Sequence, residues 1–344
     1  MQALLPISGL GLLTCFLAVL LGWLVMRIGP KDHPDGGRKS QSTAMPTSGG
    51  IAVFLSVIPF SLFAVLNEPG FFSIPVLVAM AGSLYMFIMG LWDDLTDLSA
   101  SLKLVAQIVL AVGVAALGVR VEFFDLGRHY FELGAILGIA GSAAWLVVVT
   151  NAVNFMDGAD GLAMGSSATL SAGLAGLAAL TGHYDIAALS GIMFAGLLGL
   201  LYWNGRGKLF AGDTGALFVG FYLAALSLIW VARLDASVWI APCLFIGFLA
   251  DVLLTLIWRY RNGRSLMTPH REHVYQLMIA GGTSHVLTAW VYIWITLHGI
   301  LVAGVSLVFP RGGAMLGFLL LLAILFWLSR RIRRSAIENG FLVP

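Results

Sequence analysis

A short polar stretch between two long apolar runs holds the side chains best suited to chemistry. Residues 151–162 contain two amides, Asn151 and Asn154, and two carboxylates, Asp157 and Asp160, each followed by a glycine. The spacing predicts that the amides share a helix face, and that the carboxylates share one if the turn stays helical. Glycines allow positive φ and close ligand approach. These groups suit hydroxyl or uracil-type donors or a metal shell, while the alternative is an Asx-rich turn with Asp160 as a helix cap.

Two adjacent carboxylates, Asp93 and Asp94, directly follow another apolar run. Their charges repel, so a bound divalent cation or a raised pKa would stabilise the pair. The alternative is a pair of solvated loop carboxylates. Lys103 and Gln107 lie one turn apart at the start of the next run and could face the same site, although Lys103 could equally be an interfacial lysine.

A third acidic site is predicted at Asp213, in the sequence Gly-Asp-Thr-Gly that precedes a further apolar run. The glycines on either side of Asp213 and Thr214 leave room for a carboxylate to approach a cation without crowding. The alternative is that Asp213 is the N-cap of the following helix, and both functions are compatible.

The longest polar loop, residues 259–284, which we call the late loop, combines arginines with two histidines, His270 and His273. Arginines such as Arg264 recognise phosphates through paired donors, and histidines add neutral or cationic donors. We expect phosphate or substrate contact here rather than metal ligation, because the hard oxygen ligands lie elsewhere in the sequence. The arginines alone would also fit a topology signal. The remaining histidines are isolated and are expected to be structural or solvated: His33, His129, His183, His285 and His298.

Two further charged residues have open assignments. Lys39, in the first polar loop (29–47), is either a phosphate or nucleotide contact or a topology charge. Asp251 lies inside an apolar run, so it needs a buried partner and supports either the site or the fold.

The composition describes a membrane protein. Of the 344 residues, 59% are hydrophobic and only 10% are charged, whereas soluble domains have about 25% charged residues. The net charge of +2 gives no indication of nucleic-acid binding. Both cysteines lie inside apolar runs without a disulfide or zinc pattern.

Eleven apolar runs are long enough to cross a bilayer, which takes about 20 residues. We therefore predict an all-α polytopic membrane protein that forms a single domain, 1–344, with the first run retained as a span rather than cleaved as a signal peptide. The Gly-, Ala- and Ser-rich run at 162–181 suits helix packing more than lipid contact. The predicted runs are 4–28, 48–66, 74–92, 102–119, 133–152, 162–181, 186–203, 215–231, 237–258, 285–309 and 313–329.

The distribution of basic residues predicts the orientation. With the N-terminus outside and the C-terminus cytoplasmic, fifteen of the nineteen lysines and arginines lie on the cytoplasmic side. The cluster Arg330–Arg334 is then best explained as a topology anchor beside anionic lipid. This orientation gathers every motif-bearing loop on the cytoplasmic face: 29–47, 93–101, 151–162, 204–214 and 259–284.

Taken together, these motifs resemble the polyprenyl-phosphate N-acetylhexosamine-1-phosphate transferases of the glycosyltransferase 4 type. The resemblance covers most of the chain and rests on the entry to the second run (Pro46-Thr47-x-Gly49-Gly50), the paired aspartates, the sequence Asn-x-x-Asn-x-x-Asp-Gly-x-Asp-Gly-Leu, Gly212-Asp213, Asp251, and the late histidine loop. It implies transfer of a sugar-1-phosphate from a UDP-N-acetyl-amino sugar to undecaprenyl phosphate, with release of UMP, in the bacterial inner (plasma) membrane.

The resemblance also implies roles for single residues. Asp213 would be the main Mg²⁺ ligand, with Mn²⁺ as a substitute metal, and Asp94 would share metal binding and catalysis. Asp93 would be the base for the lipid phosphate or the nucleophile of a two-step reaction. Asn154, Asp157 and Asp160 match positions linked to nucleotide binding, and His270 and His273 match the histidine loop that helps bind substrate phosphates. Further substrate contacts are predicted from the residues alone at Lys39, Lys103, Asn151 and Arg264.

One departure from the family pattern guides the choice of substrate. The branch that acts on UDP-MurNAc-pentapeptide usually has consecutive histidines in the late loop, whereas here Arg271 and Glu272 separate the two. This favours the branch that starts O-antigen or other surface glycans, with the peptidoglycan enzyme as the alternative. Two further alternatives are a prenyltransferase of another class and a transporter that uses its acids as ion sites. Whether the protein forms a homodimer is left open by the sequence.

Overall fold

The computed structural model describes residues 4–28, 31–32, 45–46, 48–234, 236–266, 268, 270–309 and 312–343. Within these residues the chain is a helical bundle with two very short antiparallel strand pairs. The elements are α1 (Leu4–Ile28), β1 (Lys31–Asp32), β2 (Met45–Pro46), α2 (Gly49–Asn67), α3 (Ile74–Thr96), α4 (Ala100–Ala116), β3 (Phe123–Leu126), β4 (His129–Glu132), α5 (Gly134–Phe155), α6 (Leu162–Leu180), α7 (Tyr184–Asn204), α8 (Gly212–Arg233), α9 (Ile240–Leu244), α10 (Ile246–Arg261), α11 (Val274–Ala280), α12 (His285–Ser306) and α13 (Gly312–Glu338).

The predicted fold class is confirmed: the chain is an all-α polytopic membrane protein. In the described part, nine helices are long and apolar enough to span a bilayer. Two predicted spans differ. The run at 102–119 forms the 17-residue α4, and the run at 237–258 is interrupted at Phe245, which separates α9 from α10. About eleven crossings therefore result only if α4 and the α9–α10 pair each cross once.

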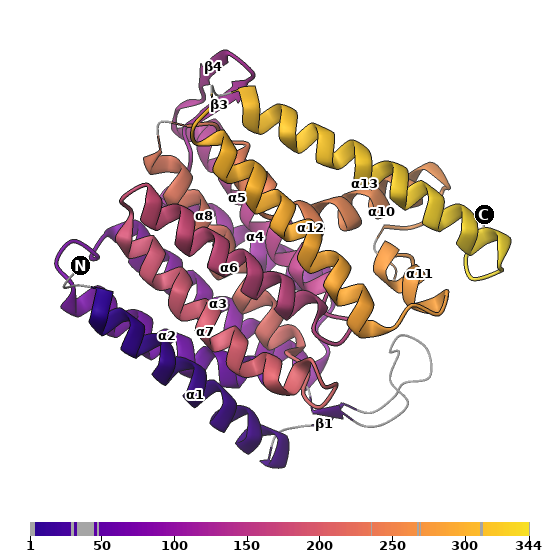
Figure 1. The fold of residues 1–344 in the computed structure, drawn as a ribbon, viewed down its shortest axis with the longest axis horizontal. Coiled ribbons are helices and arrows are strands. Elements are labelled where there is room, and N and C mark those ends of the chain that lie inside the picture. Colours follow the sequence, from indigo (N-terminus) through magenta and orange to yellow (C-terminus); the bar gives the residue numbers. More distant parts are fainter. Residues whose placement is uncertain are drawn as a thin grey trace.

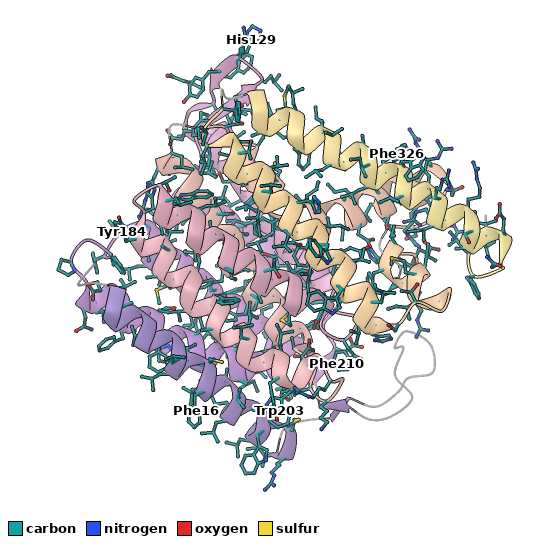
Figure 2. The ribbon with its side chains drawn as sticks, viewed as in Figure 1. Phe16, His129, Tyr184, Trp203, Phe210 and Phe326 are labelled. Carbon is teal, nitrogen blue, oxygen red and sulfur yellow. The ribbon has the colours of Figure 1, made fainter. Side chains whose placement is uncertain are left out.

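The helices run roughly side by side, so the bundle has two ends (Figure 1). One end carries the start of α1 and the hairpin of β3 and β4, and we call it the hairpin end. The other carries β1, α11 and the C-terminus, and we call it the site end. Figure 2 places His129 and Tyr184 at the hairpin end, and Trp203 and Phe210 at the site end.

Helix α8 is the centre of the bundle. Buried residues make up 94% of its apolar segment, compared with 22% for α1 and 17% for α13 at the rim. It packs against α3, α5 and α2. Rim side chains such as Phe16 and Phe326 point away from the bundle (Figure 2), as expected where the surrounding solvent is lipid. The predicted packing role of α6 is confirmed, since it lies against α7 and α12.

The paired glycines at the start of α2 dock this helix onto the start of α8. The amides of Gly49 and Gly50 donate to the carbonyls of Phe210 and Ala211, both at 2.9 Å. These bonds satisfy two of the amides that a helix N-terminus leaves unpaired. A Cβ on Gly50 would lie 2.5 Å from the Cα of Gly215, so only glycine fits there.

The last helix differs most from its predicted bounds. The apolar run 313–329 predicts a helix that stops before the arginines, but α13 continues to Glu338 and includes all of Arg330–Arg334. Similarly, the loop predicted at 259–284 contains the short helix α11. Both differences arise where the C-terminal part of α13 packs on the segment that follows α10.

Candidate active site

Four carboxylates from three separate segments meet at the site end. Asp93 and Asp94 come from the last turns of α3, Asp157 from the turn between α5 and α6, and Asp213 from the first turn of α8. Within the described residues, the cation in ion-pair contact with this cluster is Lys103, whose Nζ lies 2.5 Å from Asp93 and 3.4 Å from Asp213. The cluster therefore carries more negative than positive charge.

Asp213 is more accessible than Asp93: 33% of its side chain is exposed, compared with 3% for Asp93. Its Oδ1 accepts a hydrogen bond from Asn154 Nδ2 at 3.0 Å, and its Oδ2 faces Lys103. Gly212 directly before it has a φ of +70°, which a residue with a Cβ rarely adopts. Asp213 thus has an open face that can meet a ligand.

The carboxylate of Asp94 caps α8 from another helix. Its Oδ1 accepts from the amide of Asp213, and its Oδ2 accepts from the amide and hydroxyl of Thr214, at 3.0, 3.0 and 2.5 Å. The sequence alternative in which Asp213 is the N-cap of α8 is wrong, because the helix already begins at Gly212 and no side chain of its own caps it. Asp94 instead holds the backbone of Asp213 and Thr214 in place through its hydrogen bonds.

Asp93 is buried behind Asp213. Its Oδ1 accepts from the amide of Leu98 at 2.9 Å and its Oδ2 accepts from Lys103. The two carboxylates of Asp93 and Asp213 also contact each other. The alternative of a solvated loop carboxylate is therefore wrong for Asp93. An ion pair with Lys103 also excludes a purely interfacial role for this lysine.

The amides of the central stretch reach two different partners. Asn151 donates to the side chain of Gln107 and to the carbonyl of Val147, while Asn154 donates to Asp213. Of the pair Lys103 and Gln107, Lys103 contacts the carboxylates and Gln107 contacts Asn151, so the expectation that they face one site stays a prediction. Asn151 holds α4 against α5, whereas Asn154 lies at the carboxylates.

The two carboxylates of the central stretch do not share a helix face. Residues 156–161 form a turn rather than a helix, so Asp157 lies at the cluster and Asp160 faces His285 at 3.3 Å. Burial raises the pKa of Asp157 well above its usual range, and the charges of Asp213 and Asp94 raise it further. Burial also raises the pKa of Asp160, against the opposing effect of His285. The expectation that His285 is isolated is wrong.

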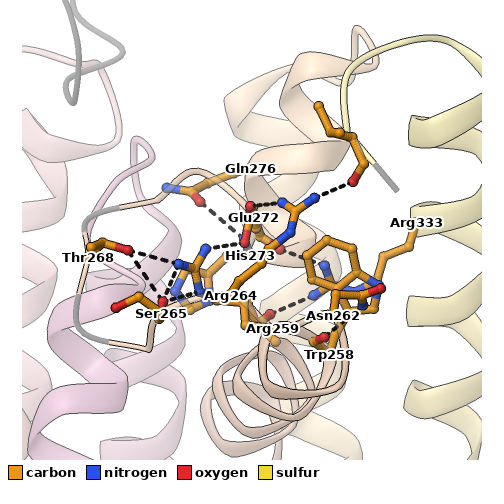
Figure 3. Close-up of polar contacts among 12 residues, drawn as sticks. Trp258, Arg259, Asn262, Arg264, Ser265, Thr268, Glu272, His273, Gln276 and Arg333 are labelled. Atoms are coloured by element: carbon orange, nitrogen blue, oxygen red, sulfur yellow. Dashed lines mark hydrogen bonds and ion pairs between the residues drawn. The ribbon is translucent and has the colours of Figure 1, made fainter.

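Glu272 organises the late loop. Its carboxylate pairs with Arg259 and Arg264, as the dashed lines in Figure 3 mark. Burial alone would raise the pKa of Glu272, but hydrogen bonds and charges from the two arginines outweigh burial and lower it. Arg264 also donates to the carbonyl of Val343 at 2.6 Å. These partners hold the guanidinium of Arg264 within the protein.

The two histidines of the loop stack on each other, with ring centroids 5.0 Å apart. Nδ1 of His273 lies 3.1 Å from the buried carboxylate of Asp251, which answers the predicted need of Asp251 for a partner. His270 is different, since its buried Nδ1 has no hydrogen-bond partner among the described residues. Burial and the nearby charges of His273 and Arg259 lower the pKa of His270 to about 4, so its ring is neutral at pH 7.

The late loop touches the central stretch. Tyr275 donates from its hydroxyl to the carbonyl of Phe155 at 3.1 Å, and the rings of Phe155 and His273 lie 6.0 Å apart. A Cβ on Gly158 would collide with the Tyr275 hydroxyl. The histidine loop is thus continuous with the segment that carries Asn154 and Asp157. The remaining predicted contact, Lys39, lies outside the described residues.

The oxygen ligands of the cluster fit a hard divalent cation. No group of three or more His, Cys, Asp or Glu side chains is arranged as a complete metal site in the residues that the structure describes. Mg²⁺ is usually held by only one or two carboxylates, with water and substrate phosphates as the other ligands. Two touching carboxylates beside a single lysine match that requirement, and Asp213, the more exposed of the two, would hold the metal.

Sequence comparisons support one family. A profile of glycosyl transferase family 4 matches residues 76–231. A probable undecaprenyl-phosphate N-acetylglucosaminyl 1-phosphate transferase of Bacillus subtilis is 31% identical over 268 residues, which cover 76% of this chain and 73% of the relative. The chain belongs to the polyprenyl-phosphate N-acetylhexosamine-1-phosphate transferase family.

Other relatives carry different names. A decaprenyl-phosphate N-acetylglucosaminephosphotransferase of Mycobacterium leprae is 29% identical over 342 residues, 89% of this chain and 85% of the relative. A phospho-N-acetylmuramoyl-pentapeptide-transferase of Halalkalibacterium halodurans is 28% identical over 292 residues, 78% of this chain and 84% of the relative. Relatives named for N-acetylglucosamine transfer and for N-acetylmuramoyl-pentapeptide transfer thus both match most of this chain, and the comparisons do not decide between the two branches.

Three residues with clear structural contacts here were missed or misassigned in the sequence. Thr214 shares the Asp94 carboxylate with the start of α8, His285 pairs with Asp160, and Arg333 is buried against the late loop. For Thr214, the signal available in the sequence was its position directly after Asp213. His285 and Arg333 lie far along the chain from their partners, and no local pattern marks them.

Proposed function

We propose that the protein transfers a sugar-1-phosphate from a UDP-N-acetyl-amino sugar, with UDP-GlcNAc as the first candidate, to undecaprenyl phosphate. The products are a polyprenyl-diphosphoryl sugar and UMP, and the reaction starts O-antigen or another surface glycan. The carboxylate cluster around Lys103 carries the proposal, because two anionic phosphate substrates can meet there only if cations offset their repulsion. The family membership supports the reaction class.

The bonds that change are those of the sugar nucleotide. An oxygen of the lipid phosphate attacks the β-phosphorus, and the bond from that phosphorus to the bridging oxygen breaks, so UMP leaves with the bridging oxygen. Asp213 would hold Mg²⁺, or Mn²⁺ in its place, and the bound metal would supply positive charge to offset the negative charge of the diphosphate. Asp213 and Asp93 orient the reactants, and Lys103 adds a positive charge beside them.

Each carboxylate has a separate task in the proposal. Asp213 presents its exposed face as the metal ligand. Asp93 accepts the proton of the lipid phosphate, since it lies directly behind Asp213 and can exchange its bond with Lys103 for one with the substrate. Asp94 acts as a positioning residue, because its oxygens are committed to the start of α8. Its predicted share in metal binding stays a prediction.

The nucleotide would lie along the central stretch and the late loop. Asn154 and Asp157 border the cluster, and His270 has a neutral ring nitrogen without a partner among the described residues. His273 can donate from Nε2 to a phosphate when both ring nitrogens carry a proton, since Nδ1 donates to Asp251. The bound partners of Arg264 and Asn151 suit support of the site better than substrate contact.

The proposal places the site end on the cytoplasmic face of the bacterial inner membrane. The basic residues support this orientation, since the positive-inside rule puts fifteen of nineteen lysines and arginines there. UDP-sugars are made in the cytoplasm, which suits this side. The peptidoglycan branch is the second candidate, because the Halalkalibacterium halodurans relative bears that name.

One assay tests the reaction and the branch together. Purified protein in lipid nanodiscs is incubated with undecaprenyl phosphate, Mg²⁺ and one labelled sugar nucleotide at a time: UDP-GlcNAc, UDP-GalNAc or UDP-MurNAc-pentapeptide. We expect lipid-linked product and UMP with an N-acetylhexosamine donor. Product from UDP-MurNAc-pentapeptide alone would establish the second candidate. UDP release in place of UMP would refute the sugar-phosphate transfer, and turnover in EDTA would refute the metal.

A further inference from the structure

One arginine of the C-terminal cluster is unlike its neighbours. Arg330, Arg331 and Arg334 are exposed, as expected for a topology anchor beside lipid headgroups, but Arg333 is only 5% exposed. Its guanidinium lies over the ring of Trp258 on α10, with 4.9 Å to the centroid. A buried cation is unfavourable unless hydrogen bonds or counter-charges compensate it, so the contacts of Arg333 call for an explanation.

The guanidinium of Arg333 binds the late loop at its centre. Nη1 donates to the backbone carbonyl of Glu272 at 2.9 Å, and Glu272 is the residue between Arg271 and His273. The side chain of the same Glu272 is held by Arg259 and Arg264 (Figure 3). The backbone beside the stacked histidines is thus fixed from α13, while the Glu272 side chain is fixed by Arg259 at the end of α10 and by Arg264 of the loop.

A second donor of Arg333 is linked to His273 by hydrogen bonds through Thr255 and Asp251. Nη2 donates to Thr255 Oγ1 at 2.7 Å, and the Thr255 hydroxyl donates onward to Asp251 Oδ1 at 3.3 Å. The same oxygen of Asp251 lies 3.1 Å from Nδ1 of His273. An unbroken series of hydrogen bonds therefore runs from Arg333 through Thr255 and Asp251 to the ring of His273.

Asp251 makes this series rigid. Its carboxylate also accepts hydrogen bonds from the amides of Val274 and Tyr275, at 3.0 and 3.1 Å, and from the hydroxyl of Tyr292. With the Asp251 carboxylate as acceptor, Nδ1 of His273 carries a proton, so Nε2 is the ring nitrogen that can donate to a phosphate once it is protonated as well. Outer partners of this kind set the tautomer and orientation of a working histidine.

The end of the chain closes the arrangement. Leu342 is 5% exposed and packs with Leu277 of α11 and Ala336 of α13. The carbonyl of Val343 accepts from Arg264. The tail after α13 thus covers the short helix that follows His273, so both sides of the histidine segment are attached to the C-terminal part of the protein.

We propose that Arg333 is a positioning residue of the active site, which orients His273 and the adjoining backbone for contact with the diphosphate of the sugar nucleotide. The inference rests on the proposed substrate contact of His273. It assigns to the last helix a function in catalysis, beyond that of a membrane anchor. Arg333 does not itself touch substrate in this proposal.

The test compares Arg333→Gln with Arg331→Gln, an exposed arginine on the same turn of α13. Hydrogen exchange of the peptides over 270–280, measured by mass spectrometry on substrate-free protein in nanodiscs, reports on the loop without any need for activity. Steady-state kinetics with UDP-GlcNAc and undecaprenyl phosphate then report on the site. Loss of a charge-assisted hydrogen bond predicts a KM for UDP-GlcNAc about tenfold higher, with a kcat within about threefold of the parent.

We expect faster exchange in the loop and the KM increase for Arg333→Gln, neither change for Arg331→Gln, and partial recovery with Arg333→Lys. If Arg333→Gln fails to insert, Thr255→Val takes its place, because it removes the connecting hydroxyl at nearly constant volume. Unchanged exchange, or faster exchange with an unchanged KM, overturns the proposal. A parent protein without turnover on any UDP-sugar would instead refute the proposed function, and the exchange measurement would still decide whether Arg333 holds the loop.

Discussion

Two pairs of aspartates, one at each end of the bundle, differ in whether each carboxylate has its own hydrogen-bond donors. At the hairpin end, Asp125 accepts from the hydroxyl of Ser237 and the amide of Val238, and Asp185 pairs with Arg233 at 2.6 Å. Each acid there has its own donors. At the site end, Asp93 and Asp213 touch each other and share Lys103.

The difference separates structural acids from functional ones. A buried carboxylate with matched donors stabilises the fold, and its loss leaves donors unpaired. Carboxylates that repel one another are unfavourable for stability and become favourable only when a cation binds. We therefore expect substitutions of Asp93 and Asp213 to remove activity with little loss of stability, and substitutions of Asp125 and Asp185 to do the reverse.

The largest effect on activity is expected for Asp213→Asn. The change keeps the shape and relieves repulsion, but it removes the charge that would hold the metal. We expect transfer to fall by about a thousandfold with normal insertion and an equal or higher Tm. Activity is measured as UMP release in nanodiscs and stability by thermal unfolding in detergent. Mg²⁺-dependent turnover near the parent rate would remove Asp213 from its role.

Asp93→Asn should follow, with a rate about 10²- to 10⁴-fold lower if Asp93 accepts the proton of the lipid phosphate. The matched control is Asp97→Asn, which changes an exposed carboxylate one turn further along the chain. We expect the control to retain the parent rate. Near-normal turnover of Asp93→Asn would contradict its assignment as the base, and an equal loss in the control would point to the charge of the segment instead.

A glycine on α3 should matter nearly as much as a carboxylate. A Cβ on Gly90 would lie 2.5 Å from the carbonyl oxygen of Asp213, whereas a Cβ on Gly113 of α4 would meet nothing within 4 Å. Gly90→Ala must push α3 away from the start of α8, and a displacement of about 1 Å can cost about 10²-fold in rate. Gly113→Ala should leave kcat unchanged. Equal kinetics for the two variants would show that the cluster tolerates the shift.

Asp125→Ala tests the other half of the comparison. It leaves the hydroxyl of Ser237 and the amide of Val238 without their acceptor, which costs about 1–3 kcal/mol. We expect a lower Tm by differential scanning fluorimetry, with the transfer rate per folded molecule unchanged. A lost rate at full stability would abolish the distinction between the two ends.

The smallest effect is a dependence of stability on pH through His270. The pKa of this buried ring is about 4, below the 6.5 of an ordinary histidine. The unfolded chain therefore binds a proton that the folded chain does not, so stability falls as pH drops from about 6.5 towards 4. The lowered pKa of Glu272 acts in the same direction at still lower pH. His270→Gln should flatten the fall of Tm between pH 6.5 and 5, and an unchanged slope would contradict the burial of His270.

Much of the fold could be predicted because the bilayer imposes it. Nine of the eleven apolar runs became helices long and apolar enough to span a bilayer, eight of them with bounds close to those expected, since backbone groups in lipid must bond within their own helix. The prediction failed where a helix is held by other elements. Phe245 interrupts one predicted span, and α13 extends through the arginines because Arg333 has partners on α10 and the late loop.

The sequence by itself determined which polar groups lie at helix ends, because glycine spacing and hydropathy are local properties. It thereby located Asp93, Asp157 and Asp213, and the structure brings these residues together. Only the tertiary structure decided how the acids divide their tasks. Asp94 caps α8, Asp160 turns to His285, and Asp251 holds His273. Such pairings depend on distances between helices that are far apart in the chain, and no local pattern encodes them.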